Sequence, residues 1–334
     1  MLKIGSLNLK KQFILAPMAG ISDLAFRIFN RQYGCELAFS EMINVRSLGY
    51  KSRKTESMLQ TTPEDSPFGV QILGCEEEFI KRGLDILNSF SAKGGSASGG
   101  NFDILDFNAA CPEKKVTRRG EGASLLKEPK KMNRLLRLVV RNSKVPVTVK
   151  IRTGWDNSRK AEDIAFYAQD SGIKALFIHG RTKLQGYSGD VDYKTIKKVK
   201  DALGIPVIAS GDIFSAGLAK KMFDETGCDG ILVARGAFGN PWIFKQLDDF
   251  LKHGTIGRQL GLVNISDIAD AMIEQLNLCT KFNGERTGVV IFRKFFIWYT
   301  QGVRNVRRLR NRACLAKTNV DMLSTINEFK KLHL

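Results

Sequence analysis

A cysteine stands where an apolar run meets a basic, glycine-containing segment, and it is the clearest candidate for chemistry in this sequence. Residues 106–126 read DFNAACPEKKVTRRGEGASLL, with Asn108 ending the apolar run and Cys111 just beyond it. A thiol with a pKa of about 8.5 is mostly protonated at neutral pH, so Cys111 could serve as a general acid. The alternative is a small buried hydrophobe, which we expect for the other five cysteines: 35, 75, 228, 279 and 314.

The segment after the cysteine is strongly basic, with Lys114, Lys115, Arg118 and Arg119. Cations aimed at the sulfur would lower its pKa and leave less thiol, so we expect these side chains to point away and to bind phosphates. The whole chain has 52 Lys and Arg against 34 Asp and Glu, a formal net charge of +18. Such an excess favours a polyanionic partner, either nucleic acid or an anionic membrane face. A generally basic proteome would give the same total.

The elements that must position these residues form a repeating pattern of short apolar runs and amphipathic segments. Most runs are apolar on both faces, which is typical of parallel strands covered by helices. Eight strand–helix repeats within about 240 residues predict an α/β fold of the (β/α)8 TIM barrel type. A doubly wound sheet is the alternative, but no GxGxxG follows the first strand. The predicted strands are 12–16, 36–41, 67–72, 103–108, 146–151, 174–179, 206–210 and 229–234.

The reactive groups of such a barrel lie at the carboxyl ends of its strands. This chain places there many hydrogen-bond donors and few acids, a set that suits an electron-rich ring such as a flavin or a pyrimidine. The glycine-bearing turns at 210–213 and 234–241 could hold a phosphate through backbone N–H groups. The residues at the strand ends are Pro17, Met18, Ala19, Gln71, Asn108, Lys150, Arg152, His179, Arg181, Ser210, Gly211, Asp212, Ala234 and Arg235.

The strand pattern stops after Trp242, and the rest of the chain has a helical pattern. We therefore expect a barrel over 1–245 followed by a smaller all-helical domain over 246–334. Its segment 293–317 carries eight Lys or Arg and no acid, with aromatic residues between them. We expect the aromatic residues to pack inward and the charges to contact phosphates. The stretch SAKGGSASGGN at 91–101 is expected to be a flexible loop without function.

Several classes of protein are disfavoured. The six cysteines lack CxxC spacing and there are only three histidines, so neither a disulfide framework nor a metal site is expected. No run of eighteen apolar residues suggests a membrane helix, and the first residues lack the apolar stretch of a signal peptide. A cytoplasmic monomer is the expectation.

A series of motifs carries a family resemblance. In chain order they cover roughly residues 1–245, and together they resemble the tRNA-dihydrouridine synthase family, closest to its bacterial B-type branch. The helical tail also resembles the tRNA-binding domain of that family. The motifs are APMAGISD (16–23), SEM (40–42), VQILG (70–74), NxxCP (108–112), KIRTGW (150–155), IHGRT (178–182), SGDI (210–213) and ARGAFGNPWIF (234–244).

The resemblance implies an FMN-dependent enzyme that uses NADPH to reduce a uridine in the D-loop region of tRNA. Reduced FMN would give hydride to C6 of the uracil, and Cys111 would give the proton to C5. Cofactor-binding positions are matched by Pro17, Met18, Ala19, Gln71, Lys150, His179, Ser210, Gly211, Asp212, Ala234 and Arg235. Substrate-binding positions are matched by Asn108, Arg152 and Arg181, with Lys114, Lys115, Arg118 and Arg119 on the RNA phosphates.

Three positions depart from the family pattern. Ala110 and Ala234 stand where glycine is usual, and Ser210 stands where asparagine is usual. The alanine before the cysteine would disturb the loop if its backbone needed a positive φ. Two other functions remain open: an FMN barrel that acts on a free pyrimidine, like a dihydroorotate or dihydropyrimidine dehydrogenase, and a tRNA-binding protein without catalysis. The basic helical tail favours an enzyme that acts on tRNA.

Overall fold

The computed structural model describes residues 1–92, 101–254 and 263–332. Most of the low-complexity stretch at 91–101 therefore lies outside the described residues. Contacts divide the chain into two compact units. The first holds Met1–Ser22, Glu36–Ile213 and Gly217–Ala234, and the second holds Asp23–Cys35, Phe214–Ala216 and Arg235–Leu334.

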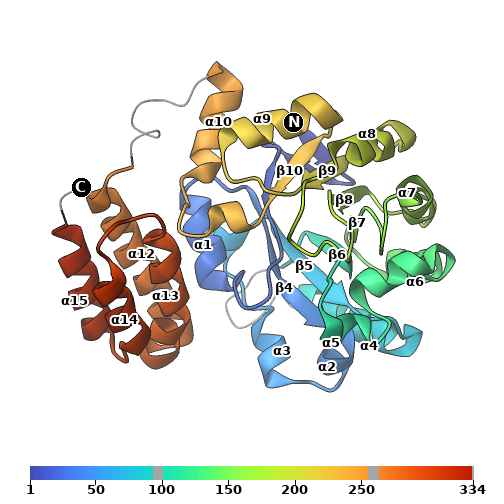
Figure 1. Ribbon diagram of the computed structural model, residues 1–334. Helices are drawn as coiled ribbons and strands as arrows, with labels where there is room; N and C mark the ends of the chain where they lie inside the picture. The colour runs from blue at the N-terminus through green and yellow to red at the C-terminus, as the bar shows by residue number, and fades with distance from the viewer. Residues whose placement is uncertain (93–100, 255–262, 333–334) are drawn as a thin grey trace. The chain divides into compact units, whose positions relative to one another are not determined.

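Eight parallel strands close into a barrel in the first unit, which confirms the predicted fold class (Figure 1). Every strand lies within a few residues of its predicted range. The strand order around the barrel is β10-β3-β4-β5-β6-β7-β8-β9. The strands are β3 (Phe13–Leu15), β4 (Leu37–Asn44), β5 (Phe68–Leu73), β6 (Ile104–Ala109), β7 (Val147–Arg152), β8 (Ala175–His179), β9 (Val207–Ser210) and β10 (Gly230–Val233).

The strands are apolar along their length because both faces are covered. All six residues of β5 and all six of β6 are buried. Inside the barrel the rings of Phe39 and Phe177 meet edge to face, with centroids 5.6 Å apart. Gly69 leaves room for one of them, since a Cβ there would lie 2.3 Å from the Phe39 ring. The barrel interior is thus a packed core, as the TIM architecture requires.

An N-terminal hairpin, β1 (Leu2–Ile4) and β2 (Leu7–Leu9), was not predicted from the sequence. Each strand has only three residues, too few to give a clear alternation of polar and apolar positions. Leu2, Ile4 and Leu9 are buried in one core cluster with residues of the barrel interior. At the turn, a Cβ on Gly5 would lie 2.9 Å from Pro146, the residue before β7. The hairpin therefore covers the amino-terminal end of the barrel.

Helices connect the strands as the predicted pattern requires. Helices α6 and α8 are amphipathic, each with its apolar side buried. The connecting elements are α2 (Val45–Gly49), α3 (Arg53–Ser57), η1 (Pro63–Asp65), α4 (Glu77–Ala92), α5 (Lys114–Thr117), η2 (Gly122–Lys127), α6 (Pro129–Asn142), α7 (Ala161–Asp170), α8 (Tyr193–Ala202) and α9 (Ala216–Thr226).

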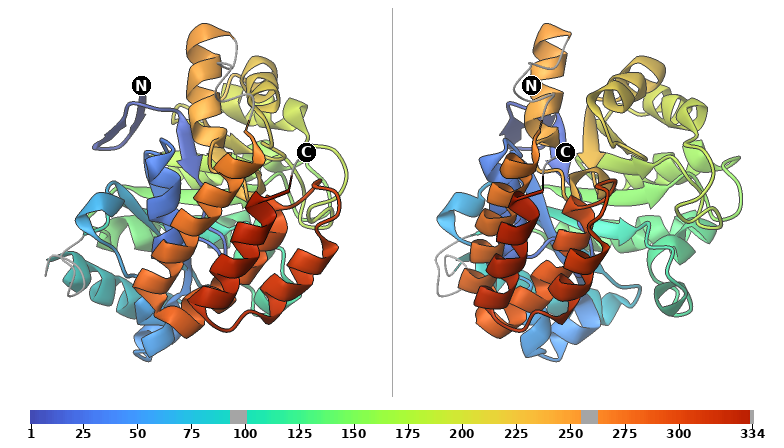
Figure 2. Two further views of the ribbon diagram at one scale, coloured as in Figure 1. Left: turned by 90° about the vertical axis from the view of Figure 1, so that its left-hand side faces the viewer. Right: turned by 60° about the vertical axis from the view of Figure 1, so that its left-hand side comes forward.

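The second unit is helical apart from its connecting turns. Helices α12 to α15 lie side by side as a bundle in both views of Figure 2. Capping boxes at Asn264 and Thr318 begin α12 and α15. The elements of the unit are α1 (Leu24–Gln32), η3 (Arg235–Ala237), α10 (Ile243–His253), α12 (Ile265–Asn283), α13 (Glu285–Tyr299), α14 (Arg307–Leu315) and α15 (Asn319–Lys330).

Aromatic packing explains why α1 groups with the C-terminal helices, although it follows the first barrel strand in sequence. The ring of Phe26 stacks on Phe295 with centroids 5.3 Å apart. Trp298 stacks on Phe238 at 4.1 Å. Phe295, Phe296 and Tyr299 are buried, so the expectation that the aromatic residues of 293–317 pack inward is confirmed. Within the described ranges, no helix is long and apolar enough to cross a membrane.

Candidate active site at the carboxyl ends of the strands

The register of the barrel brings the predicted site residues next to one another. Asn108 of β6 pairs with Lys150 of β7. Arg152 of β7 pairs with His179 of β8, which in turn pairs with Ser210 of β9. Residues predicted one by one from separate strand ends therefore line the same end of one barrel.

A chain of side-chain hydrogen bonds leads from the barrel interior to Cys111. The Gln71 amide nitrogen donates to Asp106 at 2.7 Å, and the Gln71 carbonyl accepts from the Asn108 amide at 2.8 Å. The Asn108 carbonyl then accepts from the backbone N–H groups of Ala110 at 3.0 Å and Cys111 at 2.9 Å. The loop that carries the thiol is thus fixed to two buried strands.

Asp106 is a site residue that the sequence reasoning missed. Its carboxylate is fully buried and also accepts a hydrogen bond of 2.7 Å from the Thr148 hydroxyl. Burial raises the pKa of Asp106 to about 7, although the hydrogen bonds and the charge of Lys150 oppose that rise. A signal was present: an acid in the middle of the apolar run DILDFN needs a buried partner.

Lys150 presents a donor that the protein does not use. Burial, with a smaller contribution from Arg152, lowers the pKa of Lys150 to about 8. Over the described ranges its ammonium group has neither a hydrogen-bond acceptor nor an ion-pair partner within bonding distance. Asp106 attracts it electrostatically, yet the carboxylate hydrogen-bonds Gln71 and Thr148. Lys150 is half-buried, so its ammonium group can still reach a ligand oxygen or ring nitrogen that would accept its hydrogen bonds.

Cys111 lies just past β6, partly buried. Burial raises the pKa of its thiol; the backbone N–H of Glu113, Arg152 and Lys150 act against this rise, while the Glu113 charge adds to it. Beyond the cysteine, α5 exposes Lys114 and Lys115 and buries Val116, and Arg118 and Arg119 just after this helix are also exposed. None of these four cations is among the groups that shift the pKa of the Cys111 thiol. The sulfur therefore stays protonated at neutral pH despite its basic neighbours.

Arg152 donates hydrogen bonds to three backbone carbonyls and so joins two loops. Its Nε donates to the carbonyl of Ala110 at 2.8 Å, just before the cysteine. One terminal nitrogen donates to the carbonyls of Thr182 at 2.9 Å and Gly186 at 2.7 Å, in the loop after β8. Arg152 is almost fully buried, so it positions the loops while its predicted contact with substrate stays a prediction.

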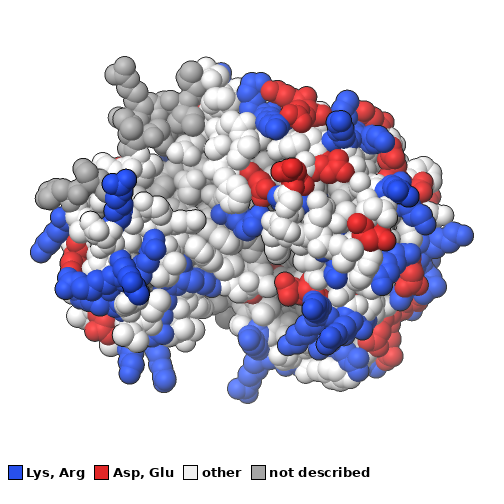
Figure 3. Space-filling view, in the orientation of Figure 1, with Lys and Arg blue, Asp and Glu red and all other residues white. Residues whose placement is uncertain are grey.

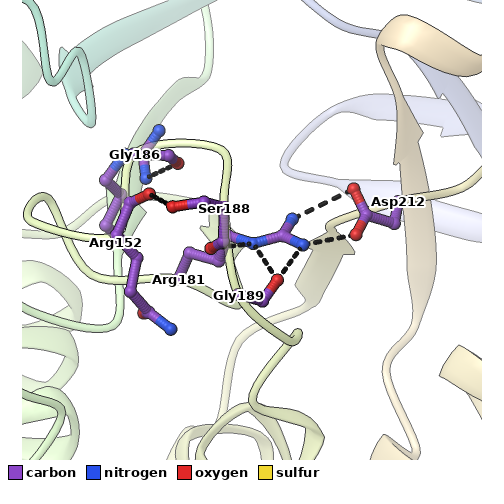
Figure 4. Close-up of polar contacts among 7 residues, drawn as sticks. Arg152, Arg181, Gly186, Ser188, Gly189 and Asp212 are labelled. Carbon is purple, nitrogen blue, oxygen red and sulfur yellow. Dashed lines mark hydrogen bonds and ion pairs between the residues drawn. The ribbon is translucent and has the colours of Figure 1, made fainter.

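Arg181 is similarly occupied, as Figure 4 shows. Its guanidinium pairs with both carboxylate oxygens of Asp212 and also donates to the carbonyl of Gly189. Asp212 holds a positive φ of 51°, and Gly211 before it has a φ of 137°. The ion pair thus fixes the turn after β9, where a phosphate is expected, and neutralises the one acid there. The substrate contact predicted for Arg181 also stays a prediction.

The remaining predicted residues lie at turns and strand ends. The Met18 carbonyl accepts from the backbone N–H groups of Ile21 and Ser22, which closes a tight turn that follows Pro17 and contains Ala19. The Ser210 hydroxyl donates to the carbonyl of Ile178 at 3.3 Å. The His179 ring lies 6.3 Å from the Tyr187 ring. Ala234 follows β10 directly, and Arg235 begins η3 and lies over the Phe214 ring at 5.4 Å.

A sequence model of the dihydrouridine synthase family matches residues 14–333. The chain belongs to this family. A protein of Rickettsia bellii named probable tRNA-dihydrouridine synthase is 36% identical over 331 residues, which are 98% of each chain. The tRNA-dihydrouridine synthase B of Pasteurella multocida is 38% identical over 304 residues, 91% of this chain and 88% of that one. The resemblance read from the motifs is confirmed.

Solved structures share the barrel of this family member. An old yellow enzyme homologue from Zymomonas mobilis superposes with a TM-score of 0.52 and 14% identity over 77% of this chain and 92% of that one. Histamine dehydrogenase from Rhizobium sp. 4-9 gives a TM-score of 0.55 and 12% identity, over 83% and 50%. At such low identity the likeness concerns the fold.

The departure from the family pattern at Ala110 has little structural effect. Ala110 does not adopt the positive φ that would have favoured glycine. Its N–H is bound by Asn108 and its carbonyl by Arg152, so an ordinary L-residue fits the turn. Glycine is needed instead at Gly122, where φ is +58° and a Cβ would lie 2.8 Å from the Cys111 carbonyl.

Part of the positive charge of segment 293–317 is neutralised by an acid that lies outside this segment. Arg308 and Arg312 of α14 both pair with Glu328 of α15, an acid that the segment 293–317 does not contain. Arg293 donates to the Ala316 carbonyl and Arg310 to Thr300. Figure 3 nevertheless shows Lys and Arg gathered over the helical unit with few acids among them. Among the described residues, no group of three or more His, Cys, Asp or Glu could hold a metal ion.

Proposed function

We propose that this chain reduces a uridine in the D-loop region of tRNA to 5,6-dihydrouridine, with FMN as its flavin and NADPH as its electron donor. Three facts support the proposal: membership of the dihydrouridine synthase family, the names of the relatives, and a barrel shared with old yellow enzyme. The single observation that carries it is the hydrogen-bonded chain that holds a protonated Cys111 beside Lys150.

The donors at the strand ends fit a flavin ring. Lys150 has a half-buried ammonium group without a hydrogen-bond acceptor among the described residues, and the second hydrogen of the Gln71 amide is not taken by Asp106. Both would bind the electron-rich edge of the ring, with His179 and the turn at Pro17, Met18 and Ala19 around it. The flavin, when bound and reduced, supplies hydride to C6 of the uracil.

The phosphate of the cofactor would lie at the turns after β9 and β10. The backbone of Ser210, Gly211 and Asp212 and that of Ala234 offer N–H groups that could hold it, and the cofactor contact expected of Arg235 stays a prediction. Asp212 does not repel the phosphate because its charge is balanced by Arg181.

Cys111 supplies the proton that completes the reduction. After hydride arrives at C6, negative charge develops toward C5 and O4 of the uracil. The thiol gives its proton to C5 and becomes a thiolate, which Lys150 and Arg152 stabilise electrostatically. Asn108 holds the loop so that the sulfur keeps its place.

The substrate is recognised mainly through its phosphates. The uracil must leave its stack to reach the barrel. Lys114, Lys115, Arg118 and Arg119 are exposed next to the thiol and would bind the backbone on either side of the target. In this proposal residues 246–334 act as the tRNA-binding domain, and the enzyme works as a monomer.

The test is direct. The purified protein is incubated with NADPH and tRNA that lacks dihydrouridine, and the product is quantified by mass spectrometry of nucleosides. The wild type should make dihydrouridine, and the matched variant Cys314→Ser, at an exposed cysteine, should equal it. Cys111→Ala should lose at least about a hundredfold in rate. Reduction of free uracil or orotate without any effect on tRNA would replace the proposal with a small-pyrimidine oxidoreductase.

A further inference from the structure

Two lysines and one tryptophan from three successive loops meet at the carboxyl end of the barrel. Trp155 follows β7, Lys127 ends η2 after β6, and Lys183 lies in the loop after β8. The Lys127 ammonium is 4.0 Å from the centre of the indole ring, and that of Lys183 is 4.5 Å from it. Both distances are within the range of cation–π contacts. These three side chains are here called the Trp155 cluster.

The Trp155 cluster offers donors and no acceptor. Over the described ranges neither ammonium forms an ion pair or a hydrogen bond, and the indole N–H has no acceptor. The adjacent acids do not compensate: Glu128 pairs with Lys131 at 3.8 Å, and Asp156 accepts from Asn157. Two positive charges held at one ring repel each other. An anion bound at the cluster would reduce that repulsion and give these donors an acceptor.

The backbone holds the cluster in place. Gly154 allows a tight turn before Trp155, since a Cβ there would lie 1.9 Å from the carbonyl of Asn157. The backbone N–H of Lys183 donates to Gly154 at 2.9 Å, and that of Leu184 donates to Trp155 at 3.0 Å. The loops after β7 and β8 are therefore bound to each other at the residues that carry the lysine and the indole.

The same loops are tied to the thiol. Arg152 binds the carbonyls of Thr182 and Gly186, which flank Lys183, and also the carbonyl of Ala110, next to Cys111. A ligand that binds the Trp155 cluster is thus held at a fixed position relative to the proton donor. This end of the barrel is also the one that the substrate must approach.

We propose that Lys127, Trp155 and Lys183 form a binding site for a backbone phosphate of the RNA substrate. The inference rests on the proposed function for its substrate. The ammonium groups and the indole N–H would bind oxygens of the RNA backbone and so fix the strand beside the extruded base. The other nucleotide phosphate available to this enzyme is that of the dinucleotide reductant, and the experiment separates the two.

The experiment titrates tRNA against the flavin-loaded protein without reductant, at several salt concentrations. Lys127→Ala/Lys183→Ala should weaken binding about tenfold near 0.1 M salt. It should also make the dependence of log K on log salt shallower by about 1 to 2. The matched control is Lys144→Ala/Lys174→Ala, two exposed lysines that precede β7 and β8 at the opposite end of the barrel. The control should change neither quantity. Trp155→Leu, which keeps both lysines, should give a smaller loss.

Each result decides the matter. An unchanged salt slope, or equal losses in both double variants, would overturn the inference. So would a rise in KM for NADPH, but not for NADH, with unchanged tRNA affinity, because the site would then serve the 2′-phosphate of the dinucleotide. Failure of the wild type to make dihydrouridine would refute the proposed function separately, since the titration needs no turnover.

Discussion

The side-chain amide of Asn108 donates a 2.8 Å hydrogen bond to the side-chain carbonyl of Gln71, and this bond joins a buried carboxylate to the loop of the reactive thiol. On one side Gln71 binds Asp106, and on the other Asn108 binds the backbone of Cys111. Each amide donates through its nitrogen toward Asp106 and accepts through its oxygen from the side of Cys111. The orientation of one amide therefore fixes that of the next.

Asn108→Ala should release the loop without removing the thiol. The backbone N–H groups of Ala110 and Cys111 would lose their acceptor, so the sulfur would occupy its productive position less often. We expect kcat for dihydrouridine formation to fall about tenfold to a hundredfold, with the Kd for tRNA within twofold of the wild type. Alkylation of Cys111 by iodoacetamide, followed by mass spectrometry, should become faster.

A matched variant for that experiment is Asn88→Ala, whose side chain binds the Asn142 carbonyl away from the strand ends. It should leave kcat and the alkylation rate unchanged. An Asn108→Ala enzyme with wild-type kcat would show that the amide chain does not position the thiol.

Asp106 should make the free energy of unfolding depend on pH. Its pKa is raised to about 7 in the folded protein, against about 3.9 unfolded, so between these values the native state binds more protons. Stability should therefore fall as pH rises from about 4 to 7, by up to about 1.4 kcal/mol per pH unit. Urea unfolding at several pH values should give a flatter profile for Asp106→Asn. The same slope in both proteins would contradict the assignment.

Lys150 should bind the flavin more than it stabilises the fold. Lys150→Met removes a half-buried, desolvated charge that has no hydrogen-bond or ion-pair partner among the described residues, so the free energy of unfolding of the apoprotein should stay the same or rise. Flavin affinity should fall by tenfold or more, measured as the flavin-to-protein ratio and by fluorescence titration. Lys174→Met, at the opposite end of the barrel, is the control. Full flavin occupancy in Lys150→Met would refute the proposed contact.

The pKa of Lys150 has its own signature. Because it is lowered to about 8 from about 10.4, the unfolded state binds more protons between these values, and stability should rise with pH across that window. Lys150→Met should lack the rise. The window does not overlap that of Asp106, so the two groups can be told apart in one set of unfolding curves.

The pair of Arg181 and Asp212 should contribute to stability because it is largely buried. Arg181→Met would remove the ion pair with Asp212 and the hydrogen bonds to the Gly189 carbonyl, at a cost of about 3 kcal/mol in the free energy of unfolding. The exposed pair of Arg82 and Glu78 gives the comparison: Arg82→Met should cost less than about 0.5 kcal/mol. Chemical denaturation measures both, and equal losses would contradict this account.

The barrel could be predicted because its strands are short, buried on both faces and separated by helices. The pattern is visible in individual apolar runs, such as PVTVKI before Arg152. The hairpin could not be predicted, since strands of three residues carry almost no periodicity and owe their place to Leu2 and Leu9 packing into the barrel. The grouping of α1 with α13 depends on ring contacts between residues far apart in sequence, such as Phe26 and Phe295.

Site residues at strand ends could be placed from the sequence, but their partners could not. Arg152 and Arg181 were expected to offer free donors, and the structure shows those donors bound to backbone carbonyls and to Asp212. Asp106 was not predicted because it lies inside β6 and not at the end of the strand, where site residues are expected. Which donors remain free depends on loop paths after β8 and β9, and single sequences do not determine those paths.

The hairpin at the N-terminus has a practical consequence. It covers the end of the barrel opposite Cys111, and Met1 before it is fully exposed. A tag or surface linker attached at Met1 would therefore leave the thiol side unobstructed. Immobilised through its first residue, the enzyme should keep its turnover on a macromolecule as large as tRNA.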